Sequence, residues 1–295
     1  MSGPEGFLLV DKPGGCTSHD VVAATRRHTM VKKIGHAGTL DPMATGLLVL
    51  GLRRATRLLR FVQDAPKRYV ATALFGVATE SLDADGAVVS RQPMPVGESE
   101  VAGAMARFVG RQMQIPPMVS ARRVEGRRLY ELAREGLDIE REARPVTIHA
   151  IELLDFAPSD YPEVTFLVEC GTGTYVRTLA DDIARSLGGR AHLTTLRRTA
   201  NGALHVDAAV ALDDLLAEDD WTSLLLSPDA GLPDMRAVYV AEDLREAVAN
   251  GVALPARALA EHLENGPVKI IGEDGRMLAV YDVEGNRAGA AVVLA

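Results

Sequence analysis

One segment of the sequence is unusually dense in glycine and polar side chains and runs directly into an apolar stretch. It reads KIGHAGTLDPMATG over residues 33–46, and the residues that follow are LLVLGL. Glycine lets a backbone approach a ligand closely, and a polar loop beside a buried strand is a common place for a functional site. We therefore predict that residues 35–46 form a loop that carries a site and leads into a buried strand.

Asp41 and Pro42 also allow a simpler interpretation. An aspartate followed by proline is typical of a helix N-cap and first helical position. That interpretation explains two residues of the segment. It does not explain why His36, Thr39 and Thr45 lie among three glycines in the same loop.

The rest of the chain alternates strand and helix patterns without an internal repeat. Apolar or alternating runs predict strands over 7–13, 46–52, 68–77, 145–156 and 164–170. Helical spacing predicts helices over 17–28, 55–63, 99–109 and 174–187, and a short basic helix that ends at Gly136. Because these elements do not follow a regular strand–helix–strand order, the pattern favours an α+β fold.

The C-terminal part differs from the rest in composition. The acidic stretch 213–234 contains Trp221 and two prolines, which is typical of a boundary. We predict a main domain over residues 1–230 and a small domain over 235–295. The second has the strand and turn pattern of a small β-barrel.

Several sequence features exclude other classes of protein. The segment SLDADGAVV reads as a turn between strands at Asp85-Gly86, and it lacks the later residues of a calcium loop. Two isolated cysteines fit a reducing cytoplasm, and no Cys/His cluster has zinc-ligand spacing. Neither a signal peptide nor a membrane-length apolar run is present. We therefore expect a cytoplasmic protein with no metal and no membrane association.

Positive charge is concentrated in the first two thirds of a chain whose net charge is −8. Residues 1–200 carry 26 Lys/Arg and 23 Asp/Glu, and residues 201–295 carry 6 and 17. Phosphate contacts need local rather than global positive charge. The basic clusters are suggestive of nucleic-acid binding, although a charge run is more often a solvated face. They comprise Arg26, Arg27, Lys32 and Lys33; Arg53, Arg54, Arg57 and Arg60; and Arg122, Arg123, Arg127, Arg128 and Arg134.

The polar loop and five other segments together resemble one family. GHAGTLDPMATGLLVL is very similar to the motif of the bacterial tRNA pseudouridine-55 synthases, the TruB family. Further resemblance lies in LLVDKPGGCTSHD, DAPKRY, PPMVSARRVEGRRLYELAREG, GTGTYVRTLADDIA and LRRTANG. The resemblance runs in order from about residue 7 to 202. It implies a catalytic domain with a mixed, mainly antiparallel sheet flanked by helices, and a PUA-like C-terminal module.

The resemblance also implies a reaction and a set of site residues. The enzyme would isomerise uridine-55 in the T-loop of tRNA by flipping the base out, with Asp41 as nucleophile and without a cofactor. Arg177 would be the cationic partner of Asp41. The other implied site residues are Tyr69 as stacking platform and candidate proton acceptor, Tyr175 and Leu196 as pocket walls, His36 beside the flipped nucleotide, and Lys32, Arg127 and Arg128 on the tRNA backbone.

Each of these residues has an ordinary structural alternative. Without the resemblance, Arg177 would read as a surface cation, the two tyrosines and Leu196 as packing, and His36 as a structural loop histidine. Three other functions stay open: a synthase for another RNA or guided by a partner RNA, a non-enzymatic RNA-binding or tRNA-folding protein, and a metabolic enzyme with a GTGTYV phosphate loop. We expect a stand-alone monomer that acts on the T-arm of tRNA without an obligate protein partner.

Overall fold

A ten-stranded mixed sheet forms the body of the molecule. The computed structural model describes residues 3–117, 123–124, 127–128 and 141–294. The strands lie in the order β14-β1-β3-β12-β4-β11-β10-β7, with β2 paired to β3 and β13 to β12. Their bounds are β1 Gly6–Lys12, β2 Ile34–His36, β3 Thr45–Leu52, β4 Lys67–Phe75, β7 Gly110–Gln114, β10 Arg144–Ala157, β11 Glu163–Cys170, β12 Ala191–Asn201, β13 Leu204–His205 and β14 Val210–Ala211.

The sheet is mainly antiparallel, and only β1 with β14 and β3 with β12 pair in parallel. Strands β1 and β3 are buried almost throughout, because their apolar runs face packed structure on both sides. This agrees with the strand and α+β predictions. Two small strand pairs lie outside the sheet, β5 (Val77–Thr79) with β6 (Val88–Arg91) and β8 (Arg123–Val124) with β9 (Arg127–Arg128).

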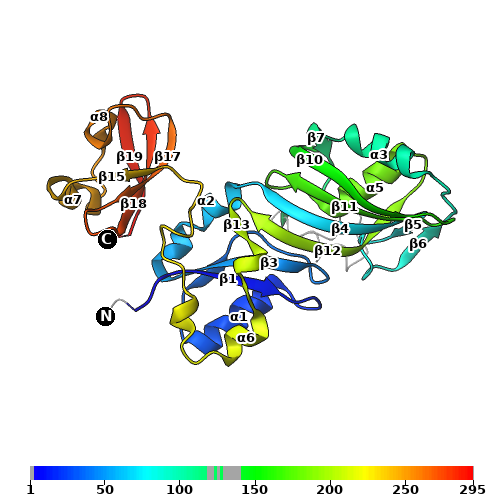
Figure 1. Cartoon of the computed structure of the whole chain (residues 1–295), viewed down its shortest axis with the longest axis horizontal. Coiled ribbons are helices and arrows are strands. Elements are labelled where there is room, and N and C mark those ends of the chain that lie inside the picture. The colour runs from blue at the N-terminus through cyan, green and yellow to red at the C-terminus, as the bar shows by residue number, and fades with distance from the viewer. Residues whose placement is uncertain (1–2, 118–122, 125–126, 129–140, 295) are drawn as a thin grey trace.

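Helices cover the two halves of this sheet separately. As Figure 1 shows, α1 and α6 lie against the half around β1 and β3, and α3 and α5 lie against the half around β10 and β12. Their bounds are α1 Ser18–Thr29, α2 Leu59–Asp64, α3 Glu98–Ala106, α5 Val176–Ser186 and α6 Leu212–Ala217, with short 3-10 turns η1 Arg53–Arg57, η2 Val206–Ala208 and η3 Trp221–Leu224.

Local sequence signals explain where the helices begin. Thr17 caps α1 in a capping box with Asp20, at the start of the helix that the sequence predicts over 17–28. The expected helix over 55–63 is instead divided into η1 and α2 at Leu58. The predicted turn between strands is found between β5 and β6. The predicted basic helix that ends at Gly136 lies outside the described residues.

A second sheet of five strands forms the C-terminal module, in the order β15-β17-β18-β19-β16. It has its own core around Ile270 and Tyr281, and its half-barrel form agrees with the predicted PUA-like module. Its elements are β15 Ala237–Tyr239, α7 Glu242–Ala249, β16 Leu254–Pro255, α8 Ala256–Leu259, β17 Gly266–Ile271, β18 Met277–Glu284 and β19 Arg287–Val293.

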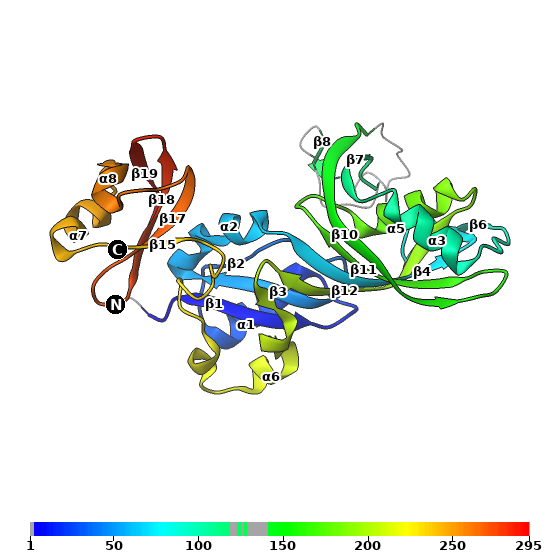
Figure 2. The same cartoon turned by 45° about the horizontal axis from the view of Figure 1, so that its top comes forward.

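The C-terminal module is packed against the main body rather than loosely tethered to it. One apolar cluster joins Leu58 and Val62 of the body with Val280 and Val292 of the module. In Figure 1 and Figure 2 alike, α2 lies on the side of the body that faces this module. Arg57 donates a hydrogen bond to the Val293 carbonyl at 2.7 Å, and Arg60 to the Ala291 carbonyl at 3.3 Å.

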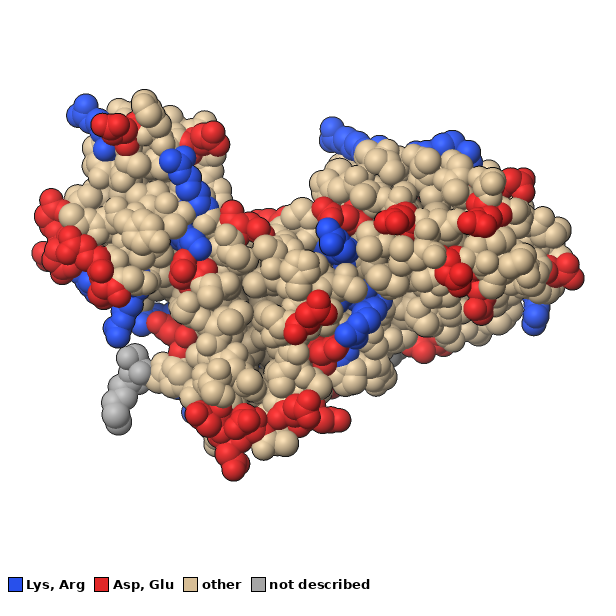
Figure 3. Space-filling view, in the orientation of Figure 1, with Lys and Arg blue, Asp and Glu red and all other residues tan. Residues whose placement is uncertain are grey.

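These contacts change the interpretation of the arginine cluster at residues 53–60. Arg54 pairs with Glu5 at 2.8 Å, and Arg57 and Arg60 bond to the C-terminal strand β19. The cluster therefore contributes to domain packing, which a sequence count of positive charge cannot reveal. Figure 3 shows that acidic side chains gather over α6 and α7, in line with the negative charge of the C-terminal third.

Removing both domain-bridging arginines should loosen the C-terminal module. We expect Arg57→Met with Arg60→Met to lower stability by about 1–2 kcal/mol in total, since each substitution removes one exposed charge-assisted hydrogen bond. Limited proteolysis should cut the variant faster than the wild type between the body and the module. Arg26→Met, at a surface position on α1, serves as the control. Equal proteolysis rates for the three proteins would show that the apolar cluster alone holds the module.

Candidate active site

The polar loop between β2 and β3 is held in place on both sides of Asp41. Ser18 at the start of α1 bonds to the Leu40 backbone N–H at 2.9 Å. The buried amine of Lys12 donates to the carbonyls of Pro42 at 3.2 Å and Ala44 at 2.7 Å. Residues 41–44 form a turn, closed by a hydrogen bond from the Ala44 backbone N–H to the Asp41 carbonyl at 3.1 Å, and not a helix, so the helix-cap interpretation of Asp41-Pro42 is wrong. A loop that leads into a buried strand is present as predicted, but it is shorter than 35–46, because β2 extends to His36 and β3 begins at Thr45.

Gly46 is required where this loop enters β3. Its φ is +99°, and a Cβ atom there would lie 2.2 Å from the carbonyl oxygen of Arg198 on the neighbouring strand β12. No side chain fits such a contact. The glycine therefore allows the loop that carries Asp41 to run directly beside β12.

Arg177 forms a bidentate ion pair with Asp41. Its Nε lies 2.9 Å from Oδ2 of Asp41, and its Nη2 donates to Oδ1 at 3.0 Å. Such a fork fixes both the distance and the plane of the carboxylate. Arg177 lies in the first turn of α5 and is only 2% exposed, whereas the Asp41 side chain is 32% exposed. The pairing that the family resemblance implies is thus present, and the surface-cation alternative for Arg177 is wrong.

The other end of the Arg177 guanidinium is occupied by the segment after β5. Its Nη1 donates to Oδ2 of Asp83 at 3.0 Å and to the Ser81 carbonyl at 2.6 Å. Asp83 is buried, and Ser81 donates a short hydrogen bond to its second oxygen. Two carboxylates therefore flank one guanidinium. The sequence pattern did not single out Asp83, because SLDADG looks like an ordinary turn.

Burial and charge act in opposite directions on Asp41. Burial raises the pKa of the Asp41 carboxyl above its usual value, the charge of Arg177 opposes that rise, and the charge of Asp83 adds to it. The ionised form of Asp41 thus depends on Arg177. A carboxylate held in this way, with part of its surface open, can act as a nucleophile.

Tyr69, Leu196 and Arg198 share one face of the sheet beside the loop. Tyr69 of β4 pairs with Arg198 of β12, and Leu196 pairs with Ala71. Directly opposed residues of an antiparallel pair project from the same face. Leu196 is 6% exposed, and Tyr69 is half-buried against the main core. Tyr69 also lies near enough to Asp41 for the aspartate charge to raise its pKa, after burial as the larger cause.

Tyr175 is fixed at the start of α5 by a glutamine from the edge strand β7. Gln114 accepts from the Tyr175 backbone N–H at 2.8 Å and donates to its carbonyl at 3.1 Å. This reciprocal pair holds the beginning of the helix that carries Arg177. Gln114 is buried, and the alternating sequence of β7 gave no signal of its role.

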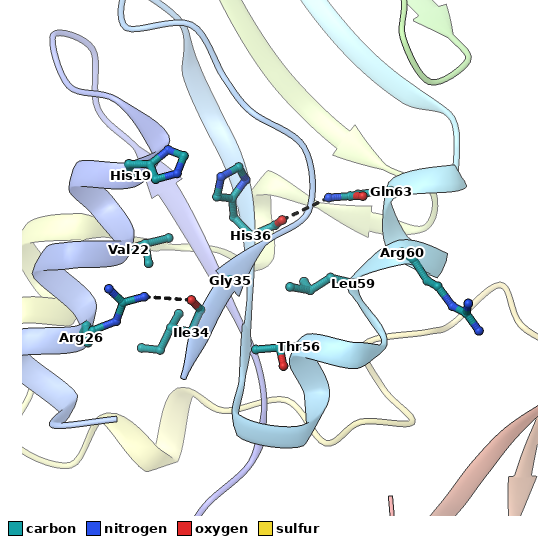
Figure 4. Close-up of a pocket in the computed structure, with 10 residues that line it drawn as sticks. All are labelled: His19, Val22, Arg26, Ile34, Gly35, His36, Thr56, Leu59, Arg60 and Gln63. Carbon is teal, nitrogen blue, oxygen red and sulfur yellow. Dashed lines mark hydrogen bonds between the residues drawn. The ribbon is translucent and has the colours of Figure 1, made fainter. Parts of the chain in front are cut away.

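His36 lies beside a surface pocket of about 550 Å³. Its ring meets that of His19 edge-on, with the centroids 5.4 Å apart, and Figure 4 shows the two rings facing each other at one end of the pocket. Burial, followed by the charge of His19, lowers the pKa of His36, which favours the neutral ring. Arg26, Arg60 and Gln63 line the remainder over the apolar side chains of Val22, Ile34 and Leu59.

The structure describes only some of the side chains that are expected to contact the tRNA backbone. Lys32 is exposed in the short connection between α1 and β2. Arg127 and Arg128 belong to β9, of which only the backbone pairing with β8 is described. Within the described residues, no cluster of three or more His, Cys, Asp or Glu could hold a metal ion. Over the same residues, no helix is both long and apolar enough to cross a membrane.

Comparison with known proteins matches most of the chain to one family. The model of the TruB family pseudouridylate synthase (N terminal domain) matches residues 26–176, and that of the tRNA pseudouridylate synthase B C-terminal domain matches residues 177–227. The tRNA pseudouridine synthase B of Burkholderia pseudomallei (strain 668) is 43% identical over 281 residues, covering 94% of this chain and 92% of that protein. Its counterpart in Mycobacterium bovis (strain BCG / Pasteur 1173P2) is 42% identical over 295 residues, covering 99% and 96%.

Solved structures agree with the fold. The structure of a Cbf5-Nop10-Gar1 complex gives a TM-score of 0.75 at 25% identity, over 97% of this chain and 83% of that one. An H/ACA RNP bound to a substrate RNA gives 0.74 at 24% identity, over 97% and 83%. The fold is that of a pseudouridine synthase. With both family models and these relatives in agreement, the chain belongs to the TruB family of pseudouridylate synthases, as the sequence motifs predict.

Proposed function

We propose that this enzyme isomerises uridine-55 in the T-loop of tRNA to pseudouridine, with Asp41 as its nucleophile and without a cofactor. The observation that carries the proposal is the two-point grip of the buried Arg177 on Asp41. The relatives that match nearly the full chain are named tRNA pseudouridine synthase B, which supports tRNA as the substrate.

The reaction moves one bond and conserves all atoms of the nucleotide. The bond from C1′ of the ribose to N1 of uracil breaks, the base turns, and C1′ bonds to C5. The proton on C5 must leave and N1 must gain one, so no oxidant or reductant is needed. Asp41 supplies the carboxylate that adds to the nucleotide and later departs. Arg177 keeps that carboxylate ionised and aims it.

Several neighbours of Asp41 support a pocket for an extruded base. Tyr69 and Leu196 lie on the sheet face beside the loop, and Tyr175 begins the helix that carries Arg177. A base taken out of its stack needs aromatic and apolar walls. The pocket beside His36 offers room for RNA next to that ring, which supports a role for His36 at the flipped nucleotide.

We infer that the enzyme acts on tRNA alone, as a monomer with a catalytic domain over residues 1–230 and a PUA-like domain over 235–295. A guided synthase that shares the fold is the main alternative, since the H/ACA and Cbf5 structures are complexes. Sequence identity favours stand-alone action on tRNA. This chain is 43% identical to the tRNA pseudouridine synthase B of Burkholderia pseudomallei but 25% identical to the matching chain of the Cbf5-Nop10-Gar1 complex.

Tritium release from a [5-³H]uridine-labelled tRNA transcript tests the proposed function directly. Purified enzyme alone should release tritium from the wild-type transcript and none above background from a transcript whose T-loop uridine-55 is changed to cytidine. Release from both transcripts would contradict the assignment of position 55. No release without an added RNA or protein would favour the guided alternative.

The basic segment around residues 122–134 should bind the tRNA backbone. We expect Arg127→Gln with Arg128→Gln to weaken tRNA binding and to reduce the slope of log affinity against log salt by about one for each phosphate that the variant no longer binds. Filter binding over a range of salt concentrations measures both. The matched control is Arg107→Gln, at the C-cap of α3. An unchanged affinity and slope would place Arg127 and Arg128 on a solvated face.

Substitutions of Tyr69 should separate stacking from proton transfer. We expect Tyr69→Phe to keep tRNA binding and to slow single-turnover chemistry by about 10²–10⁴-fold, since the ring remains but the hydroxyl that takes the C5 proton is lost. Tyr69→Ala should be worse, because the flipped base then has no platform. Rates near wild type for both variants would make Tyr69 a core residue only.

A further inference from the structure

Arg198 lies where the Asp41 loop, strand β3 and strand β4 come together. In β12 it lies opposite Gly46 of β3 on one side and opposite Tyr69 of β4 on the other. Its side chain is 1% exposed. Nε donates to the Leu47 carbonyl at 2.7 Å, and Nη2 to the Gly38 carbonyl at 3.2 Å. Arg198 thus ties both ends of the Asp41 loop to the strand beside Tyr69.

Neither of these hydrogen bonds brings a negative charge to the Arg198 guanidinium, because both acceptors are backbone carbonyls. Carbonyl oxygens satisfy the donors but do not neutralise a guanidinium, which stays protonated in proteins. Nη1 is the nitrogen not engaged by the two carbonyls. Placing a permanent cation in so buried a position is costly, and a developing anion next to it would offset that cost.

Tyr69 is the group placed to develop that anion. Burial raises the pKa of the Tyr69 hydroxyl, and Arg198 opposes the rise through its charge and through a side-chain hydrogen bond. Cys170 of β11 and Asp41 act in the other direction. Cys170 stays a neutral thiol near pH 7, because burial raises its pKa to about 11. Lys67, two residues earlier on β4, has its pKa lowered to about 8 by burial and by Arg198.

We propose that Arg198 is a positioning residue for the reaction: it holds the Tyr69 hydroxyl beside the Asp41 loop and stabilises the phenolate, so that Tyr69 can remove the proton from C5. The inference rests on the proposed function. Before this step the Tyr69 hydroxyl passes its proton to water. The C5–H bond then breaks, its proton goes to Oη of the Tyr69 phenolate, and its electron pair forms the C5–C6 double bond of the ring. The electron pair that this displaces from C6 goes to N1, or to the Asp41 carboxylate if Asp41 had added at C6. N1 gains the one proton that Tyr69 gave to water, and Arg198 keeps its own proton throughout.

Single-turnover rates against pH, with and without the Tyr69 hydroxyl, test this role. The full-length enzyme and its Arg198→Met and Arg198→Lys variants are each compared in the wild-type and Tyr69→Phe backgrounds. At neutral pH we expect Arg198→Met to lose roughly tenfold or more in rate, with the loss narrowing as pH rises, and Arg198→Lys to be intermediate. In the Tyr69→Phe background the same changes should cost less than about threefold, because the group they act through is gone.

Arg197 provides the matched control on the same strand. Its side chain points to the other face, is 42% exposed and pairs with Asp11 at 2.6 Å. Arg197→Met should not displace the pH profile. An equal loss from Arg198→Met in both backgrounds and at every pH would overturn the proposal and make Arg198 purely structural.

Two further outcomes also decide between these interpretations. If thermal unfolding shows that Arg198→Met does not fold, Arg198→Lys takes its place. A shift in its profile of single-turnover rate against pH that disappears in the Tyr69→Phe background supports the proposal. An unshifted profile overturns it. If the wild type isomerises a uridine other than position 55, the proposed substrate is wrong. The Arg198 comparison is then made on that RNA, so the two failures are distinguishable.

Discussion

The Asp41→Asn variant is expected to bind tRNA with nearly wild-type affinity and to form no measurable pseudouridine. Asparagine keeps the size of the side chain but supplies no carboxylate to add to the nucleotide. Removing the nucleophile from an enzyme that uses covalent catalysis can lower the rate by a factor on the order of 10⁶. Binding should persist, because contacts with phosphate and RNA shape supply most of the affinity.

Single-turnover tritium release and filter binding, measured on the same preparation, check both halves of this prediction. Asp64→Asn, at the exposed end of α2, is the matched control and should keep full activity. A residual Asp41→Asn rate within tenfold of wild type is a barrier change of only about 1.4 kcal/mol. That result would exclude Asp41 as the nucleophile.

The strands and the first helix could be predicted because their signals are local. The apolar runs of β1 and β3 and the capping box of α1 need only neighbouring residues to be recognised. The loop around Asp41 was also visible, since its glycines, threonines and proline lie in one short segment. Family resemblance then connected Asp41 with Arg177, which lies 136 residues away.

The rest of the site depends on contacts that no local pattern contains. Asp83 meets Arg177 across 94 residues of chain, and its own segment reads as a turn. Gln114 contacts Tyr175 at the start of α5, and Arg198 contacts the two ends of the Asp41 loop. Their residue types are ordinary, so only the sheet order reveals what they touch.

Counts of positive charge were the least specific predictor of the RNA-binding surface. The arginines at 53–60 looked like a phosphate-binding cluster, but Arg54 pairs with Glu5 and Arg57 and Arg60 bond to the C-terminal module. A sequence shows how many charges a segment carries and not whether the fold has already paired them. Direct RNA contact by residues 53–60 therefore has less support than their charge count alone suggests.

Arg177→Met should abolish activity at neutral pH and destabilise the protein more strongly than the loss of an exposed arginine such as Arg57. It removes the cation between two carboxylates, one of them the buried Asp83. Breaking a buried pair in this way typically costs about 3–5 kcal/mol. Adding Asp83→Asn should recover part of the stability, because the second buried charge is then gone, but it should not recover activity.

The pH dependence of the same variant gives an independent check. Burial already raises the pKa of Asp41, and without Arg177 nothing opposes that rise from the same position. A carboxyl whose pKa is higher in the folded than in the unfolded state binds more protons when folded, so stability falls as pH rises through that range. The variant should therefore be closest to wild-type stability near pH 5 and furthest from it near pH 8.

The residual activity of Arg177→Met should increase with pH, whereas its stability decreases. The activity should rise about tenfold per pH unit while Asp41 is mostly protonated. Denaturant unfolding and single-turnover rates over pH 5–9 measure both trends on one protein. Arg107→Met is the control: Arg107 is exposed at the C-cap of α3, where it bonds to the Ser186 hydroxyl at 3.4 Å, and the substitution should change neither trend. A flat activity profile in Arg177→Met would mean that the guanidinium orients Asp41 without keeping it ionised. Both expected trends follow from protonation of Asp41 once Arg177 is removed, so the charge of Arg177 would link folding to catalysis in this site.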